Sequence, residues 1–133
     1  MSTAYLSMAD VVALHDDLLA RYGGAAGLRD EGLLESAVTR PQMAAYYEGS
    51  DLVRQAATLI AGVAYNHPFV DGNKRTALVA GYLFLRANGT RIAAEPLEAA
   101  QAVLAALTVG TIDRAVADLD VWLRVHAAMI GDT

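Results

Sequence analysis

The amino-acid sequence predicts an all-α fold, a compact bundle of about six helices around a buried central helix. Alanine, which has a high helix propensity and packs closely between helices, is the commonest of the 133 residues. Apolar residues recur at helical spacing in successive segments that are separated by glycine or proline. Residues 76–85 are apolar on nearly every side, which is typical of a helix in the centre of a bundle.

Polar and special residues mark the ends of the first two helices. Ser7 and Asp10 form a Ser-x-x-Asp capping pattern, so a helix is expected to start there and to end after Arg21, at a Gly-Gly pair. Asp30 is the candidate cap of a second, short helix. Pro41 is expected to end that helix, because proline disfavours helical geometry in the residue before it.

The next two helices flank a polar loop. The third is expected to open at residues 50–51 and to run towards Asn66, because Pro68 cannot continue it. The fourth is expected to begin near Asn73 and to stop at residues 88–89, an Asn-Gly pair. Its apolar segment makes this fourth helix the candidate for the centre of the bundle.

The C-terminal third continues the helical pattern. Residues 90–96 form a connector that can hold a short extended piece, and residues 97–109 indicate a fifth helix. No repeat and no second domain is evident, so residues 1–133 are expected to form one domain. A sixth helix is indicated by an apolar stripe at Ile112, Val116, Leu119 and Leu123.

Composition excludes several classes of function. The chain has no cysteine, which excludes disulfides, thiol nucleophiles and cysteine-based zinc sites. Its net charge of −5 makes it a poor general binder of nucleic-acid phosphates, so no direct nucleic-acid contact is expected. The longest apolar stretch, residues 77–85, is about half of what a membrane span needs. We therefore expect a soluble cytoplasmic protein that does not enter a membrane.

The loop at residues 66–77, NHPFVDGNKRTA, concentrates the residues that can carry chemistry. Histidine, here His67, is the side chain that exchanges protons near neutrality without perturbation, which suits a general base. Asp71 follows four residues later and can hold Mg²⁺. Gly72 and Asn73 then turn into a helix N-terminus, where free N–H groups and the helix dipole favour an anion.

Lys74 and Arg75 lie in the first turn of that helix, where cations oppose the dipole by about 0.3–1 kcal/mol each. Their position is explained if an anion such as a di- or triphosphate with Mg²⁺ binds there. A purely structural loop is the alternative, because Asp-Gly-Asn is a common turn composition and a histidine before proline is usually a loop residue.

The string HPFVDGNKRTA resembles the signature loop of the Fic/Doc superfamily, H-P-F-x-[D/E]-G-N-G-R-x-x-R. Lys74 replaces the glycine of the Fic pattern and Leu78 replaces its second arginine, and both departures are those of the Doc (death-on-curing) branch. The segments LHDDLLARYGG, GLRDEGLLESAVTRPQ and GYLFLRANG also resemble Doc segments. The resemblance covers roughly residues 5 to 127.

The resemblance implies a role for each conspicuous residue of the loop. His67 is similar to the base that deprotonates a hydroxyl of the target protein, Asp71 to the Mg²⁺ ligand, and Phe69 to the apolar anchor of the loop. The residues similar to those that bind the phosphates of the nucleotide are Gly72, Asn73, Lys74 and Arg75.

For the Doc branch, the implied reaction is transfer of the γ-phosphate of ATP to a threonine of elongation factor Tu, with Mg²⁺, by a toxin that stops translation. For the Fic branch it is transfer of AMP, which stays open as an alternative. A catalytically silent, partner-binding member is a third possibility. The intact His67, Asp71, Asn73 and Arg75 argue against it.

Inhibition is expected to come from a separate antitoxin protein. Many Fic proteins carry an inhibitory motif, [S/T]-x-x-x-E-[G/N], and both Glu-Gly pairs of this chain lack the serine or threonine that it requires.

Other residues receive structural interpretations. His15 is assigned to a solvated helix face and Arg29 to a local charge pair, whereas residues 46–48 are candidates for the border of a substrate cleft.

Overall fold

The computed structural model describes residues 2–130, which form six α-helices and one two-stranded antiparallel sheet. The all-α prediction is therefore confirmed. Strand β1 (Thr90–Ile92) lies in the predicted connector, whereas its partner β2 (Ala127–Met129) was not predicted. The helices are α1 (Met8–Tyr22), α2 (Glu31–Glu48), α3 (Leu52–Asn66), α4 (Asn73–Ala87), α5 (Pro96–Leu107) and α6 (Ile112–His126).

Side-chain caps fix the starts of four helices. Ser7 and Asp10 form the expected capping box of α1. Asp30 caps α2, Asp51 caps α3 and Thr111 caps α6, each by accepting a hydrogen bond from a backbone N–H in the first turn. A cap of this kind contributes about 1 kcal/mol. The predicted starts of the first four helices agree with the structure to within a residue or two.

Pro41 does not end the second helix, and that prediction is wrong. Helix α2 continues through Pro41 to Glu48. A proline inside a helix costs about 3 kcal/mol because it removes one backbone hydrogen bond and crowds the preceding turn. The ring of Pro41 is fully buried, and α2 packs along much of α3, so tertiary packing offsets this local preference.

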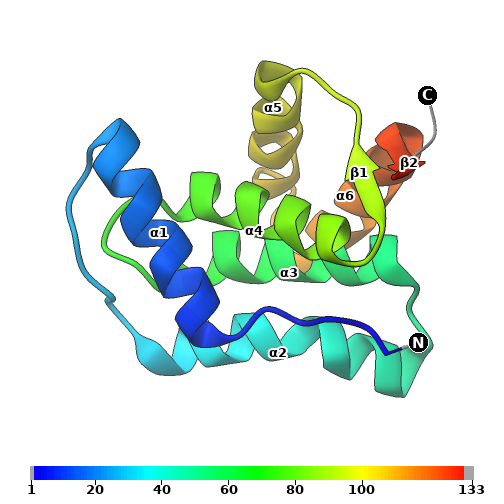
Figure 1. Cartoon of the computed structure of the whole chain (residues 1–133), viewed down its shortest axis with the longest axis horizontal. Coiled ribbons are helices and arrows are strands. Elements are labelled where there is room, and N and C mark those ends of the chain that lie inside the picture. Colours follow the sequence, from blue (N-terminus) through cyan, green and yellow to red (C-terminus); the bar gives the residue numbers. More distant parts are fainter. Residues whose placement is uncertain (1, 131–133) are drawn as a thin grey trace.

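Helix α3 is the buried centre of the bundle. Its residues 55–64 are all buried, and Figure 1 shows it between α2 and α4. Helix α3 also contacts α5 and α6. Helix α4, which the sequence favoured for this place, packs against α3 but keeps an exposed face that includes Leu83 at 42% exposure. Near its start, Lys74 and Arg75 are also exposed, whereas Asn73 and Thr76 are buried.

Two glycines let the central helices approach closely. A Cβ atom at Gly62 would lie 3.2 Å from Cα of Ala37 on α2. A Cβ atom at Gly81 would collide with the side chain of Ile60 on α3. A side chain at Gly81 would therefore displace Ile60, and one at Gly62 would need α2 to move by a few tenths of an ångström.

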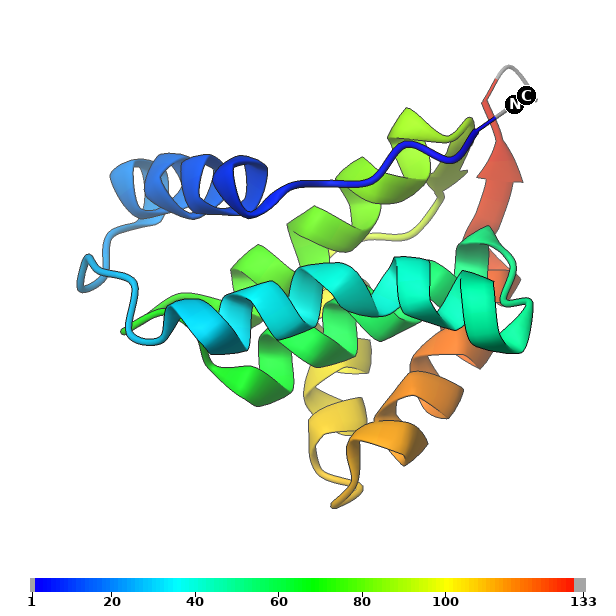
Figure 2. The same ribbon diagram turned by 90° about the horizontal axis from the view of Figure 1, so that it is seen from below.

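The loop between α3 and α4 lies at one end of the bundle. Figures 1 and 2 show it beside the segment that joins α1 to α2. Backbone hydrogen bonds join the two segments: Val70 donates to the carbonyl of Gly27, and Arg29 and Asp30 both donate to the carbonyl of Pro68. The loop is thus held by the segment between α1 and α2 as well as by α3 and α4, which flank it. Within residues 2–130, no helix has the length and hydropathy that a membrane span requires.

Candidate active site

His67 is the C-cap residue of α3, directly after its last residue, Asn66. It adopts a left-handed backbone conformation (φ 49°, ψ 55°), the only non-glycine residue with positive φ among those described. Its side chain is exposed, and its Nε2 atom has no hydrogen bond to a described residue. The Nδ1 atom lies 3.5 Å from Nδ2 of Asn73, at the limit of a hydrogen bond. The imidazole is therefore open to a substrate.

Arg29 stabilises the backbone at His67 through hydrogen bonds. Its Nε donates to the carbonyl of His67 at 2.8 Å and its Nη2 to the carbonyl of Asn66 at 3.0 Å. These carbonyls belong to the end of α3, where no helical partner remains for them and where a cation is favoured by the helix dipole. The Arg29 guanidinium thus caps the C-terminal end of α3. It does not form the local charge pair that the sequence predicted.

Phe69 and Asn73 close the loop from inside. Phe69 is 1% exposed, as expected for an anchor. The side chain of Asn73 is also buried: its Oδ1 accepts from the N–H of Phe69 and its Nδ2 donates to the carbonyl of the same residue, both at 2.9 Å. The Asn73 amide therefore braces the loop with its Oδ1 and one Nδ2 hydrogen. Its second Nδ2 hydrogen is near Nδ1 of His67, and its backbone N–H is available to an anion.

Asp71 presents an ionised carboxylate at the rim of the loop. Its Oδ1 accepts from the N–H of Gly72 at 2.8 Å, and its Oδ2 accepts from the N–H of Ala25 at 3.2 Å. The hydrogen bond from Ala25, followed by that from Gly72, holds the pKa of Asp71 below its usual range. Each oxygen keeps a free lone pair that a cation can use.

Helix α4 begins without a side-chain cap. Its N-cap is Gly72, with φ 78°, so the first N–H groups have no side-chain acceptor among residues 2–130. Lys74 and Arg75 are exposed beside them. The Arg75 guanidinium lies 4.4 Å from the ring centroid of Tyr22, a cation–π contact. A pocket of about 340 Å³ opens here, lined by His67, Val70, Asp71, Gly72, Asn73, Lys74 and Arg75.

His15 is not on a solvated face, and that assignment is wrong. It is 1% exposed, it stacks on Phe69, and its Nε2 lies 2.7 Å from the carbonyl oxygen of Asp71. The signal was in the helical spacing, because His15 stands four residues after Val11 and three before Leu18, the other two buried residues of α1. A polar side chain in a buried stripe requires a hydrogen-bond partner, and the partner of His15 is the backbone of Asp71 in the candidate site.

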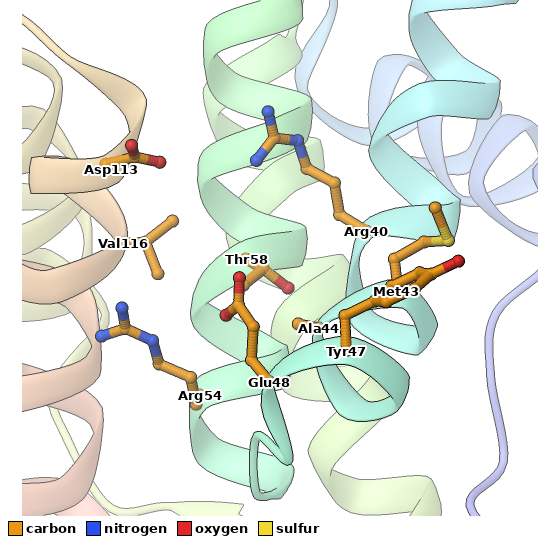
Figure 3. A pocket seen from close by; sticks show the side chains of 9 residues that line it. All are labelled: Arg40, Met43, Ala44, Tyr47, Glu48, Arg54, Thr58, Asp113 and Val116. Carbon is orange, nitrogen blue, oxygen red and sulfur yellow. The ribbon is translucent and has the colours of Figure 1, made fainter.

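Residues 46–48 lie at the end of α2 and do not border the His67 pocket. Tyr46 and Tyr47 are exposed at 81% and 72% and contact each other edge to face. Tyr47 and Glu48 line a different pocket of about 350 Å³ between α2, α3 and α6. Figure 3 shows the side chains that line it: Arg40, Met43, Ala44, Tyr47, Glu48, Arg54, Thr58, Asp113 and Val116.

The arrangement can perform phosphoryl-type transfer. An exposed imidazole, an ionised carboxylate and an uncapped helix N-terminus with two cations surround one pocket. Such transfer depends mainly on positioning and on charge stabilisation. In the described part of the chain no three His, Cys, Asp or Glu residues gather as a metal site. Mg²⁺ nevertheless fits the donor set, because it is commonly bound by one carboxylate together with substrate phosphates and water.

Sequence comparisons agree with the geometry. The family model described as the Fic/DOC family matches residues 5–85. A protein of Escherichia phage P1 named protein kinase doc is 42% identical over 107 residues, which are 80% of this chain and 80% of that protein. A protein of Mycolicibacterium smegmatis named toxin Doc is 43% identical over 97 residues, or 70% of this chain and 71% of that protein.

Solved structures show the same fold. Two structures of a Fic-1 fragment from C. elegans superpose on 91% of this chain with TM-scores of 0.60 and 0.61 at 20% identity. The superposed part is 43% and 42% of those longer chains. Since the family model spans more than half of the sequence, and both curated relatives exceed 40% identity, the chain belongs to the Fic/DOC family, and within it to the Doc branch.

Proposed function

We propose that this chain is a toxin that phosphorylates a protein, by transfer of the γ-phosphate of ATP to a serine or threonine hydroxyl. The observation that carries the proposal is the uncapped, cationic N-terminus of α4 opposite the exposed His67. A relative with 42% identity that is named a protein kinase supports the same reaction.

The chemical step follows from the residues around the pocket. The imidazole of His67 accepts the proton of the attacking hydroxyl, whose oxygen forms a bond to the γ-phosphorus. The bond from that phosphorus to the oxygen bridging to the β-phosphate breaks, and ADP leaves with the bond's electron pair. Lys74, Arg75 and the first N–H groups of α4 stabilise the charge on the phosphates.

Asp71 is the residue that would hold Mg²⁺. When bound, this ion neutralises charge on the phosphates and orients them. The carboxylate is prepared for this role, because its hydrogen bonds keep it ionised and fix its direction. Phosphate contacts from the Asn73 side chain are not part of the proposal, since that amide is already committed to Phe69.

We propose that a separate antitoxin protein binds beside this site. A pocket of about 420 Å³ with mostly apolar walls lies between α1, α4 and α5, and it shares Lys74 and Arg75 with the phosphate site. An apolar segment of a partner seated there would cover both cations. Expression of the chain alone should arrest growth, and co-expression with the neighbouring gene's product should restore it.

Labelled ATP tests the reaction. Purified protein is incubated with Mg²⁺, with either a cell extract or purified elongation factor Tu as acceptor, and with ATP labelled at the α or the γ position. We expect label to enter a protein band from the γ position only. Entry of label from the α position would replace this proposal with AMP transfer, and no entry from either would indicate a silent member of the family.

A further inference from the structure

His15 contacts the signature loop (residues 66–77) from inside the molecule. Its ring lies parallel to that of Phe69, with centroids 3.8 Å apart and planes 7° apart. Its Nε2 lies 2.7 Å from the carbonyl oxygen of Asp71. Because a carbonyl oxygen only accepts hydrogen bonds, Nε2 carries a proton and donates it. With 1% exposure the ring has no access to a substrate, so it acts through the loop.

The hydrogen bond to Asp71 fixes more than one atom. The carbonyl of Asp71 and the N–H of Gly72 belong to the same planar peptide unit. That N–H donates to Oδ1 of Asp71 itself at 2.8 Å. A donor that fixes the carbonyl therefore also fixes the N–H, and through it the direction of the Asp71 carboxylate.

The segment that follows α1 holds the other carboxylate oxygen. The N–H of Ala25 donates to Oδ2 of Asp71 at 3.2 Å. Gly24 brings this backbone close, since a Cβ atom there would lie 2.9 Å from the same oxygen. Both oxygens of the carboxylate are thus oriented from the side of α1, one directly and one through His15.

We propose that His15 is a positioning residue for the metal ligand. By fixing the peptide between Asp71 and Gly72, it sets the orientation of the carboxylate and hence the affinity for Mg²⁺ with nucleotide. This role rests on the proposed function, because it presumes that Asp71 binds Mg²⁺. Partners that orient a metal ligand typically change metal affinity by about 10- to 100-fold when they are removed.

Two substitutions separate the contacts of His15. His15→Phe retains an aromatic ring for the stack on Phe69 but has no donor for the Asp71 carbonyl. His15→Gln retains an N–H donor at about the same reach but loses the stack. If the ring serves only as core packing, the glutamine variant is the more defective in binding. If the donor positions the ligand, the phenylalanine variant is.

The variants are made in a His67→Ala background, which prevents turnover and toxicity. Binding of MgATP is measured by titration calorimetry over a range of Mg²⁺ concentrations, and folding by circular dichroism and thermal melting. His126→Phe is the matched control, because His126 also contacts a backbone carbonyl, that of Trp122 at 2.8 Å, on α6 and outside the phosphate pocket.

We expect His15→Phe to weaken MgATP binding roughly 10- to 100-fold. His15→Gln should bind nearly as the parent does but melt at a lower temperature, and His126→Phe should bind as the parent does. Equal binding by the parent and His15→Phe would overturn the role of His15 alone. Failure of the parent itself to bind MgATP would instead overturn the proposed function.

A spectroscopic test needs no change at His15. In the His67→Ala protein, the Nε2 proton of His15 and the amide proton of Gly72 should be protected from exchange. Both signals should shift when MgATP is added, while the ring signals of His126 stay in place. If the His15 and Gly72 signals do not respond to MgATP that calorimetry shows to be bound, the positioning role is wrong, even if His15→Phe fails to fold.

Discussion

The N-termini of the neighbouring helices α3 and α4 are built in opposite ways. Asp51 caps α3: its Oδ1 accepts from the N–H of Arg54, and both its oxygens accept from the Arg124 guanidinium at 2.8 Å. Helix α4 starts at Gly72, with no side-chain cap and with Lys74 and Arg75 in its first turn. The first terminus is complete within the chain. The second leaves its first N–H groups without a side-chain acceptor among the described residues, and it is there that we propose the nucleotide phosphates bind.

The largest expected effect is at His67, between these two helices. His67→Ala should lower transfer by about 10²- to 10⁴-fold, because a positioned base contributes that much. Its folding should be unchanged, since the exposed side chain has no short hydrogen bond within the described residues. The transfer rate is measured with labelled ATP and the folding by melting curves, and His126→Ala is the control. Full activity of His67→Ala would exclude His67 as the base.

The second prediction concerns a charge reversal that makes the start of α4 acidic, like the start of α3. Lys74→Glu places an acid in the first turn, so stability should rise by about 1 kcal/mol through the helix dipole. Nucleotide affinity should fall by roughly 10- to 100-fold, as expected when a charged hydrogen-bond partner is lost. Urea unfolding and calorimetry measure these opposite changes.

The control for that exchange is Arg114→Glu, in the first turn of the capped helix α6. It adds the same charge at a helix start outside the phosphate pocket, so nucleotide affinity should not change. If Lys74→Glu lowered stability and left nucleotide binding intact, the two termini of α3 and α4 would not differ in the way described.

The third prediction removes the cap of α3. Asp51→Ala should lower the free energy of unfolding by about 1 kcal/mol, because the N–H of Arg54 loses its acceptor and the Arg124 guanidinium keeps only Asp120 as a carboxylate partner. Transfer activity should stay at the parental level, since Asp51 does not line the phosphate pocket. Denaturation and activity assays on the same preparation test both statements.

The smallest effect concerns pH. The hydrogen bond from the Arg124 side chain, followed by that from the N–H of Arg54, lowers the pKa of Asp51 below its ordinary value. A lowered native pKa means that the ionised group stabilises the fold above the unfolded value and that this contribution is lost as pH falls through the native value. Asp51→Asn keeps a cap without the charge. It should be less stable by up to about 1 kcal/mol at neutral pH, and the difference should vanish once pH falls below the native pKa of Asp51.

Much of the fold could be predicted because its signals are local. Ser7, Asp30 and Asp51 each cap the helix that follows within three residues. Pro41 misled because its local penalty is outweighed by the burial of α2 against α3, and no local pattern reports that packing. Strand β2 was missed for a related reason, since three residues pair only because α6 returns the chain to β1.

The residues of the candidate site that lie within the loop were predictable, whereas the contacts that distant residues make with the loop were not. His67, Asp71 and the start of α4 lie within one continuous motif, so their chemistry and spacing could be read together. His15 and Arg29 lie 56 and 38 residues from the atoms they contact in the loop. Their contacts depend on how α1 and the segment after it return to the loop, which spacing alone does not give.

The left-handed backbone of His67 has a practical consequence. For a residue with a side chain, this conformation costs on the order of 1 kcal/mol, and glycine adopts it freely. Glycine also gains freedom in the unfolded chain, by about 0.4–1 kcal/mol, so the two effects nearly cancel in His67→Gly. Asparagine tolerates the same conformation. His67→Gly therefore removes the proposed base while keeping native stability. Such a variant would allow the complex with the proposed antitoxin to be produced in cells whose growth the active protein is expected to arrest.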